Sequence, residues 1–405
     1  MGKPKIRFGG YTDEWEEKKL GEVFEQTANF VNPNEEKMEL WSLTVEDGLS
    51  PKLERYNREF LVKKDKNFKE VRPGDIVYNP MNMTLGAVGY NGTLKSVAVS
   101  GYYITMITKK DYDVYYINTW LKSPQAIALY KIFATGSLIE KQRVQFSTLS
   151  IIPTTFPKYE EQKKIGLYFE YLDYLITLHK RKCEEIKMLK KYMLQKMFPQ
   201  KEKNKPEIRF QGFTDTWEQR KLGDIADIVG GGTPITSNDD YWDGDIDWYA
   251  PAEIADQIYV SSSERKITQQ GYENSSAKML PVGTVLFTSR AGIGKTAILC
   301  KEGCTNQGFQ SIVPHENMLD PYFIFSRTDE LKRYGEIKGA GSTFVEVSGK
   351  QMASMELMMP KTIEEQNAIG SYFQNLDHII TLHQRKCDEL KKVKKFMLQN
   401  MFPQD

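Results

Sequence analysis

The sequence predicts an α+β protein in which two α/β domains are joined by two long antiparallel coiled-coil helices, with a pseudo-two-fold internal repeat. Three observations predict this fold class. Long segments recur at a fixed offset of 202–204 residues. Two of the recurring segments carry a heptad pattern of apolar residues. The regions between them show short strand patterns separated by turn signals.

The first repeated element opens each half of the chain. Pro4–Phe8 (PKIRF) returns as Pro206–Phe210 (PEIRF), and Trp15-Glu16 returns as Trp217-Glu218. A repeat of about 200 residues is far longer than the 20–50 residues of a solenoid. The pattern therefore predicts a duplicated domain rather than a repeat array.

The second repeated element closes each half. Residues 160–200 align with residues 364–404 without a gap, and 27 of the 41 positions are identical. The middles, 24–140 and 226–340, show little similarity. Similar edges would suit two copies of one partner, and dissimilar middles would suit two different ligands. The alternative is a duplication whose middles diverged without a functional reason.

The closing segments predict two long helices. Apolar residues alternate steps of four and three over about four heptads, which is typical of a coiled coil. About 38 residues at 1.5 Å per residue give a rod of roughly 55–60 Å. The pseudo-two-fold makes the two rods antiparallel if they pack on each other. The predicted seam comprises Ile165, Phe169, Leu172, Ile176, His179, Cys183, Ile186, Ile369, Phe373, Leu376, Ile380, His383, Cys387 and Leu390.

Histidine and cysteine recur on this seam at a spacing of four residues. Antiparallel packing would bring His179 and Cys183 near His383 and Cys387, a set that matches a two-Cys, two-His zinc site. The alternative is that the cysteines pack as small apolar residues and the histidines as hydrogen-bonded seam residues. We expect no resident metal.

The middles predict mixed α/β structure. Strands are expected at Asp75–Tyr78, Val97–Val99, Tyr103–Ile107, Thr284–Phe287 and Ser311–Val313. Helices are expected at residues 115–130 and 322–334. A turn directly precedes a predicted strand in each middle, at residues 72–75 and 280–283. This common arrangement indicates that the middles share a fold.

Composition narrows the function classes. The chain has 55 Lys+Arg against 54 Asp+Glu. This balance does not indicate a protein that binds DNA strongly without a partner. A DNA-binding role would need charge from a partner. No apolar window is long enough for a membrane span, and Met1–Gly10 has no signal-like apolar run. With four cysteines, this predicts a reduced, cytoplasmic protein.

Several motifs resemble enzyme signatures but are incomplete. Gly292–Thr296 resembles a phosphate-binding loop, yet the glycine required five residues before Gly294 is Ser289. Asn79–Asn82 resembles an amino-methyltransferase tetrapeptide but lacks its second proline and aromatic residue. Gly230–Gly232 is followed by Thr-Pro rather than by a helix. We therefore predict no catalytic constellation in this chain.

Polar loops in the middles carry residue types suited to base edges. Arginine and lysine pair with guanine, and asparagine and glutamine pair with adenine. The candidate loops are residues 79–84, 140–145, 288–292 and 306–310. Each loop could equally be an ordinary solvent-exposed loop. Only the four loops together therefore support DNA binding.

With these residues in view, the whole chain resembles the specificity (S) subunit of bacterial type I restriction–modification systems. The resemblance rests on the entry Trp15…Lys19-Leu20-Gly21 and its mate Trp217…Gly223, and on the Pro…Glu-Glu-Gln…Ile segments before both helices. It also rests on the Gly-Gly-Gly-Thr-Pro segment of residues 230–234 and on Ser289–Lys295. The first middle fits the family less closely.

The resemblance implies two target recognition domains, each reading one half of an asymmetric, bipartite site in double-stranded DNA. It implies that the helices set the spacer and dock two methyltransferase subunits, and that two restriction subunits join for cleavage. Catalysis, S-adenosylmethionine, ATP and Mg would belong to those partners, and this chain would bind no cofactor. Half-site centres would lie about 10 bp apart on one face of the duplex.

The implied domains are residues 1–158 and 206–362 for recognition, 159–199 and 363–405 for the helices, and 200–205 for a linker. The predicted DNA-contacting residues are Asn79, Asn82, Thr84, Lys141, Arg143, Gln145, Thr233, Thr288, Ser289, Arg290, Lys295, Asn306, Gln307, Gln310, Ser342 and Thr343.

Two other function classes stay open from the sequence. One is an enzyme, a single-chain DNA methyltransferase or a nucleotide hydrolase, which the incomplete motifs disfavour. The other is a coiled-coil scaffold that binds proteins and reads no bases.

Overall fold

A computed structural model describes residues 3–46, 48–51, 67–136, 142–200, 203–290, 292–340 and 346–403. The chain divides into two compact units. Unit 1 comprises Met1–Arg181 with Gln384–Asp405, and unit 2 comprises Lys182–His383. Each long helix therefore contributes one half to each unit.

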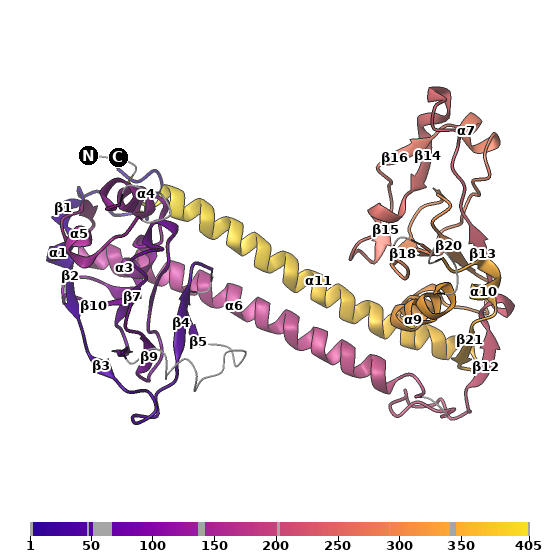
Figure 1. Cartoon of the computed structure of the whole chain (residues 1–405), viewed down its shortest axis with the longest axis horizontal. Coiled ribbons are helices and arrows are strands. Elements are labelled where there is room, and N and C mark those ends of the chain that lie inside the picture. The colour runs from indigo at the N-terminus through magenta and orange to yellow at the C-terminus, as the bar shows by residue number, and fades with distance from the viewer. Residues whose placement is uncertain are drawn as a thin grey trace. The chain divides into compact units, whose positions relative to one another are not determined.

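Unit 1 is a mixed α/β domain that ends in the first long helix (Figure 1). Its elements are β1 (Glu16–Lys19), α1 (Leu20–Val23), β2 (Phe24–Thr27), β3 (Phe30–Val31), β4 (Trp41–Thr44), β5 (Gly48–Pro51), β6 (Phe68–Val71), β7 (Ile76–Tyr78), η1 (Met83–Leu85), β8 (Val88–Tyr90), β9 (Val97–Ser100), β10 (Ile104–Thr108), α3 (Val114–Trp120), α4 (Pro124–Phe133), α5 (Phe146–Ser150), β11 (Pro153–Phe156) and the start of α6 (Tyr159–Lys196).

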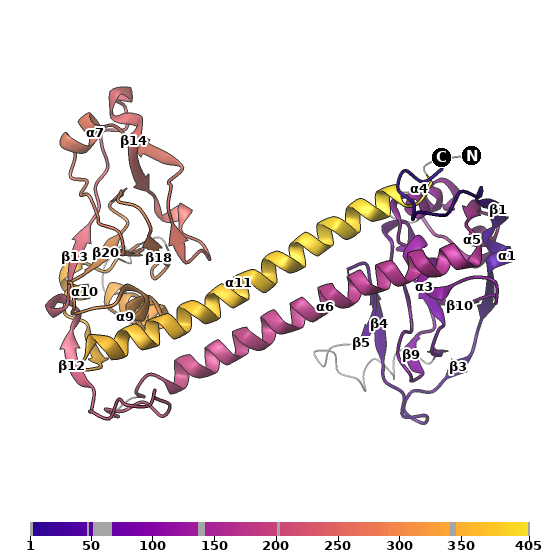
Figure 2. The ribbon, with the colours of Figure 1, turned by 180° about the vertical axis from the view of Figure 1, so that it is seen from behind.

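Unit 2 repeats this organisation with a different middle (Figure 2). Its elements are β12 (Glu218–Lys221), η3 (Leu222–Asp224), β13 (Ala226–Gly230), η4 (Asp239–Tyr241), β14 (Trp242–Tyr249), η5 (Pro251–Glu253), β15 (Tyr259–Val260), β16 (Arg265–Ile267), α7 (Gln269–Glu273), β17 (Val285–Phe287), β18 (Thr296–Leu299), β19 (Cys304–Thr305), β20 (Gln310–Pro314), α8 (Pro321–Phe325), α9 (Thr328–Gly339), α10 (Gly349–Ala353), β21 (Glu356–Met359) and the start of α11 (Ile363–Asn400).

The main sheets of the two units have the same strand order. Unit 1 has β2-β10-β7-β8, and unit 2 has β13-β20-β17-β18 with β15 added at the edge. A two-stranded ribbon, β1-β11 or β12-β21, precedes each long helix. The prediction that the middles share a fold is confirmed in this common part. They differ in their additions, which are β3-β6-β9 and β4-β5 in unit 1 and β16-β14-β19 in unit 2.

The five predicted strands are present, but each of the two predicted domain helices is interrupted. Residues 115–130 split into α3 and α4 because Pro124 begins a new helix, and Ser123 caps that helix through Ala126 N–H at 3.1 Å. Residues 322–334 split into α8 and α9 at Arg327. This guanidinium is buried and donates to the carbonyl of Met358 at 2.7 Å, a long-range contact that a local pattern does not reveal.

The long helices run antiparallel within each unit, as predicted. In unit 1, Lys394 pairs with Asp173, and the Cys387 Sγ atom lies 3.9 Å from the carbonyl oxygen of Ile176. In unit 2, Lys190 pairs with Asp377 at 2.6 Å. Residue numbers rise along α6 as they fall along α11 in these contacts. Most of the predicted seam is buried, and the rest is half-buried: Ile176, His179, Ile186, Ile380 and His383.

Each unit uses the end of the helix that began in the other unit to complete its core. Phe402, after α11, stacks on Phe169 of α6 with ring centroids 6.1 Å apart. Phe198, after α6, stacks on Phe373 of α11 at 6.0 Å. All four rings are buried. Burying rings of this size contributes strongly to core stability, so each core requires a chain segment about 200 residues away in sequence.

The repeated entry segments are held by a matched ion pair in each unit. Arg7 contacts Glu161 through two bonds of 2.6 and 2.7 Å, and Arg209 contacts Glu365 with the same two lengths. Both glutamates are buried at the start of a long helix. Bidentate pairs of this kind are geometrically specific, so they fix the entry segment against the helix.

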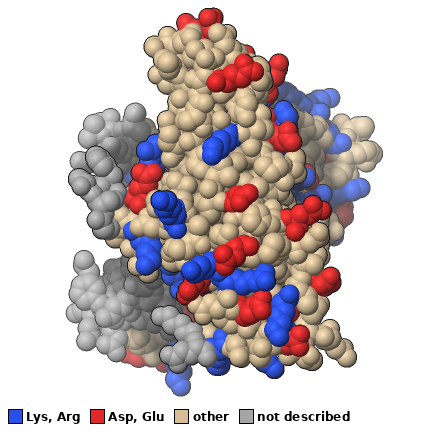
Figure 3. Space-filling model, turned by 90° about the vertical axis from the view of Figure 1, so that its right-hand side faces the viewer, with Lys and Arg blue, Asp and Glu red and all other residues tan. Residues whose placement is uncertain are grey.

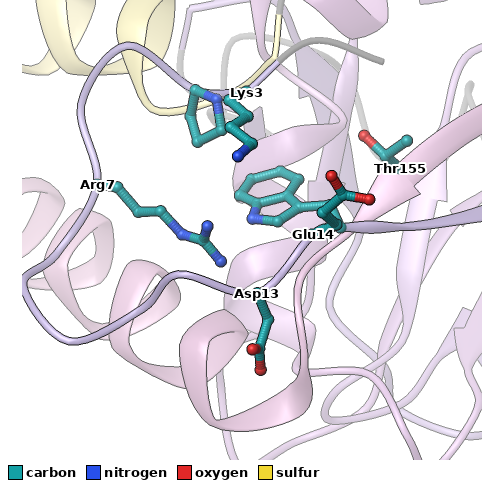
Figure 4. Close-up of a pocket in the computed structure, with 7 residues that line it drawn as sticks. Lys3, Arg7, Asp13, Glu14 and Thr155 are labelled. Atoms are coloured by element: carbon teal, nitrogen blue, oxygen red, sulfur yellow. The ribbon is translucent and has the colours of Figure 1, made fainter.

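The two ion-pair sites differ in one hydrogen bond, which a neighbouring tryptophan donates in unit 2 and not in unit 1. Trp217 Nε1 donates to Glu365 Oε1 at 3.1 Å, whereas Trp15 Nε1 has no hydrogen-bond partner among the described residues. Trp15 instead borders a small open pocket that Lys3, Arg7 and Thr155 also line (Figure 4). The duplicated framework is therefore closely, but not completely, conserved between the units.

Among the described residues, no helix is long and apolar enough to cross a membrane.

The exchanged aromatic contact generates a stability prediction. Phe402→Ala should destabilise unit 1 by about 3–5 kcal/mol, because it leaves a cavity beside Phe169 and Tyr116. Native-state hydrogen exchange in α3 would report the loss locally. Phe396→Ala on the same helix, where the ring is 55% exposed, should change protection by less than about 0.5 kcal/mol. Equal effects of the two substitutions would contradict the assigned core.

Candidate nucleic-acid interface

At one edge of the unit 2 sheet two strands end and a third begins, and the predicted loops lie there. Gly230 at the end of β13 pairs with Gln310 at the start of β20. β17 runs antiparallel to β20, with Val285 paired to Ile312, so the end of β17 reaches the same edge. The segments 231–234, 288–295 and 305–309 therefore meet although they are far apart in sequence.

Thr288 closes the loop between β17 and β18. Its Oγ1 atom accepts from Lys295 N–H at 2.9 Å and donates to the Gly292 carbonyl at 2.8 Å. The loop needs Gly294, because a Cβ there would meet Lys332 at 2.3 Å and because φ is +94°. A strand follows this loop, whereas a phosphate-binding loop opens a helix. The segment is therefore a closed hairpin loop that displays Arg290 and Lys295, both exposed.

Ser289 ties three loops together through its backbone. Its N–H donates to the carbonyl of Gly308 at 2.8 Å, and its carbonyl accepts from Val347 N–H at 3.0 Å. The side chains of Thr288 and Ser289 are fully buried. Both side chains therefore point into the loop and are shielded from solvent.

The remaining described candidates in unit 2 lie around this closed loop. Thr233 donates to Gln307 Oε1 at 2.6 Å, which joins the 231–234 segment to the 305–309 segment. The Asn306 carboxamide oxygen accepts from Gly308 N–H at 2.7 Å. Gln307 is exposed, and Thr233, Asn306 and Gln310 are half-buried. Ser342 and Thr343 lie outside the described residues.

The buried carboxylate of Asp247 stabilises the strands that lead into these segments. Asp247 of β14 accepts from Ser263 N–H at 2.9 Å and contacts Lys301 and Lys266. Burial by itself would raise the pKa of Asp247, but these hydrogen bonds outweigh it and lower the pKa to about 2. The next residue, Trp248, pairs with Cys304 of β19. A charged, fully bonded Asp247 therefore anchors the strand that leads into Asn306.

Unit 1 forms the equivalent edge with different residues. The loop after β7 turns at Asn79, whose side chain accepts from Met81 N–H at 3.0 Å. Val144 N–H donates to the Pro80 carbonyl at 3.0 Å and brings residues 142–145 to this loop. The same bond joins Val347 to Ser289 in unit 2. In each unit, the loop that follows the equivalent strand is therefore bonded to a segment about 60 residues further along the chain.

The candidates of unit 1 are more exposed than those of unit 2. Asn82, Arg143 and Gln145 are exposed, and Asn79 and Thr84 are half-buried. Gln145 also precedes the first residue of α5. Lys141 lies outside the described residues. The structure thus places every described candidate of unit 1 at one edge of its sheet.

The face drawn in Figure 3 carries Lys and Arg interspersed with Asp and Glu, without a region of one sign. This agrees with the near-neutral composition. Phosphate contacts supply much of the affinity of DNA-binding proteins. A phosphate backbone laid on the face drawn in Figure 3 would therefore meet charges of both signs.

No group of three or more His, Cys, Asp or Glu side chains in the described part of the chain is arranged to hold a metal ion. Cys183 and Cys387 are buried on the helix seam, each with its sulfur 3.9 Å from a backbone carbonyl oxygen. Each thiol thus lies against the neighbouring helix and donates a weak hydrogen bond to its backbone.

The structure also presents exposed apolar residues that the candidate set did not include. Tyr171, Tyr174, Tyr192 and Phe396 on the long helices are each about half exposed or more, at 49–60%. The sequence already contained this signal, because these four aromatic residues stand outside the heptad seam. They form a second type of candidate surface, suited to a protein partner.

Comparison with known proteins identifies the family to which this chain belongs. The family model described as "Type I restriction modification DNA specificity domain" matches residues 12–188 and again residues 214–392. The chain therefore belongs to this family, with two copies of the domain in tandem.

Individual relatives agree with this assignment. The chain is 34% identical over 189 residues to the type I restriction enzyme MjaIX specificity subunit of Methanocaldococcus jannaschii, a match that spans 44% of that relative's length. It is 22% identical to the putative MjaX specificity subunit of the same organism over 96% of this chain and 93% of the relative. It is 29% identical to the EcoR124I/EcoR124II specificity subunit of Escherichia coli over 40% of this chain and 42% of the relative.

Solved structures share the fold at low sequence identity. The type I restriction–modification S subunit from M. genitalium matches with a TM-score of 0.66 and 15% identity over the full length of both chains. A chain from a study of type I restriction–modification complex assembly matches with a TM-score of 0.52 and 16% identity, over 96% of this chain and 98% of that one.

The hydrogen bonds of this loop predict that substitutions at Thr288 and Arg290 affect the stability of unit 2 to very different degrees. Thr288→Val should destabilise unit 2 by about 1–3 kcal/mol, because it leaves Lys295 N–H and the Gly292 carbonyl without their partner. Arg290→Ala, at an exposed position, should stay within about 0.5 kcal/mol. Urea unfolding, monitored by hydrogen exchange at residues 285–299, measures the change in unfolding free energy for both variants. Similar losses in the two variants would contradict the assigned roles.

Proposed function

We propose that this chain is the DNA-recognition subunit of a type I restriction–modification complex and that each α/β domain reads one half of an asymmetric, bipartite site. The observation that carries the proposal is the convergence of two polar loops at one sheet edge in each unit, on a shared fold with different residues. A shared fold suits two equivalent positions on a duplex. Different loop residues suit two different half-sites.

The proposed boundaries are residues 1–158 and 206–362 for the recognition domains, 159–199 and 363–405 for the helices, and 200–205 for the linker. In unit 1 the proposed base-contacting residues are Asn79, Asn82, Thr84, Lys141, Arg143 and Gln145. In unit 2 they are Thr233, Arg290, Lys295, Asn306, Gln307, Gln310, Ser342 and Thr343, with Thr288 and Ser289 in support.

The helices are proposed to set the spacer between half-sites and to dock two methyltransferase subunits. Exposed apolar residues recur at equivalent positions: Leu189 of α6 matches Val393 of α11, and Tyr192 matches Phe396. A surface that is repeated within one chain suits two copies of one partner. Two restriction subunits would complete the cytoplasmic complex, and those partners would supply catalysis, S-adenosylmethionine, ATP and Mg.

A methylation map tests the recognition role. The chain is expressed with the methyltransferase subunit of its own system in a host without other methylases, and modified bases are sequenced genome-wide. We expect one two-part motif with a fixed gap. Each well-formed base contact contributes about 1–3 kcal/mol of discrimination, so Arg290→Ala should relax one half of the motif only, and Asn82→Ala the other half only.

The control is a complex with a different specificity subunit that is active in the same host. A complex of the present chain that is assembled but leaves no motif would favour the scaffold function instead. Relaxation of both halves by one substitution would contradict the assignment of one domain to each half-site.

The spacer role predicts a change in the gap alone. Four residues inserted into both helices at equivalent seam positions add about 6 Å, which corresponds to roughly 2 bp at 3.4 Å per base pair. The motif should keep both half-sites and gain one or two positions between them. A four-residue insertion in the surface turn at residues 92–95 is the control and should leave the gap unchanged. An unchanged gap in an active helix variant would contradict the spacer role.

A further inference from the structure

Unit 2 holds one of its arginines against a pair of tryptophan rings. Trp242 and Trp248 of β14 meet edge to face, with ring centroids 5.1 Å apart and an interplanar angle of 88°. The guanidinium carbon of Arg265, in β16, lies 3.6 Å from the centroid of the Trp242 ring and 6.0 Å from that of Trp248. A separation of 3.6 Å is van der Waals contact, so the guanidinium packs directly on Trp242.

Burial and hydrogen bonds fix both rings. Trp242 is 6% exposed and Trp248 is 5% exposed. The Trp248 indole N–H donates to the carbonyl of Gly232 at 2.8 Å, and the Trp242 indole N–H donates to the carbonyl of Ile235 at 3.3 Å. Strand pairing places Arg265 directly opposite Trp248. The fold therefore sets the orientation of this arginine before any ligand binds.

The N–H groups of this arginine are left for a ligand. Arg265 is exposed, and within the part of the chain that the structure describes its guanidinium has no hydrogen bond or ion pair. Side chains alternate along a strand, so Asp247 points to the opposite face of the sheet from Trp248 and Arg265. Asp247 pairs there with Lys266. The nearby buried carboxylate is thus engaged elsewhere.

The tryptophan pair adjoins the recognition edge of unit 2. The bond from Trp248 ends on Gly232, and the next residue, Thr233, bonds to Gln307. In both views of the ribbon, β14 projects beyond β18 and β20 of the main sheet (Figures 1 and 2). Arg265 therefore extends the row of polar groups that lies at this edge.

The chemistry of a stacked arginine suits one group on DNA. A guanidinium whose face is covered still presents N–H groups along its edge, and guanine offers O6 and N7 as a matching pair of acceptors in the major groove. A phosphate also offers paired oxygens. Asp243, Asp245 and Glu264, in or next to the same two strands, are exposed carboxylates that would repel a phosphate. The uncharged edge of a base is therefore favoured.

We propose that Arg265 reads a guanine in the half-site assigned to unit 2, and that Trp242 and Trp248 fix its orientation for this contact. The inference rests on the recognition role proposed above and adds to it a residue from outside the predicted set. The added sheet β16-β14-β19 thereby takes part in specificity. Unit 1 has other additions, β3-β6-β9 and β4-β5, so this contact belongs to one half-site only.

The test is a set of methylation maps, each from the full chain assembled with the methyltransferase subunit of its own system. Arg265→Ala should relax one guanine position, in the same half of the motif that Arg290→Ala relaxes. Discrimination at that position should fall about 5- to 150-fold, which corresponds to one lost bidentate contact. Arg265→Lys should relax the same position, because an ammonium keeps the charge but lacks the planar fork.

Two further variants separate base reading from packing. Arg265→Met keeps a long side chain over Trp242 but has no donor, so it should relax the position as fully as Arg265→Ala does. A wild-type motif from Arg265→Met would assign the arginine to packing and overturn the inference. The matched control is Arg220→Met in β12, where the side chain is 41% exposed and pairs with Glu218. This variant should leave the motif unchanged.

Binding of the same complexes to a target duplex at several salt concentrations tests for a phosphate contact. An unchanged motif with a salt slope lower by about 1 would assign Arg265 to a phosphate and overturn the guanine contact. Unchanged motif and affinity, or a relaxed position in the other half, would overturn it as well. If the assembled wild-type complex leaves no motif, the recognition role itself fails.

Discussion

The structure depends on the exchange of helix ends between the two units. Phe402 stacks on Phe169 in unit 1, and Phe198 stacks on Phe373 in unit 2. Phe402 and Phe198 each follow a helix that began in the other unit, and each ring is buried in the core of the unit where that helix ends. Neither core is complete without that contribution, so the helices cannot separate without opening a cavity in a domain. A continuous helix of 38 residues is stable here because packing holds it at both ends.

The same arrangement explains how two units share one framework and yet present different loops at the equivalent sheet edge. The ribbon, the ion pair and the start of the long helix recur almost unchanged, with Arg7–Glu161 in unit 1 and Arg209–Glu365 in unit 2. This framework presents the ends of the central strands in an equivalent way. The loops at those ends are free to differ, because their own internal bonds hold them, such as those of Thr288 and Asn79. The residues that stabilise the framework are thereby separate from the exposed loop residues that we propose to carry specificity.

Duplication within one chain also permits a small chemical asymmetry. Two separate copies of one polypeptide would present identical helix surfaces, whereas a fused pair can diverge at single positions. The exposed positions of α6 and α11 have done so at Leu167, Tyr171 and Tyr174, while the seam differs only by the exchange of Ile186 for Leu390. The seam is constrained because both helices must pack along it. The outer surface is constrained only by what binds there.

The sequence by itself determined the repeat, both long helices, their seam and five of the strands, because these features depend on periodicities of 3.5 and 2 residues that a short segment of sequence contains. Only the tertiary structure decided that α3 and α4 are separate and that Arg327 interrupts the next predicted helix, through its bond to Met358. It also decided which loop residues face outward. Thr288 and Ser289 match the polar pattern as well as Arg290 does, but their side chains are buried by segments 20 to 60 residues away, and no local pattern records such contacts.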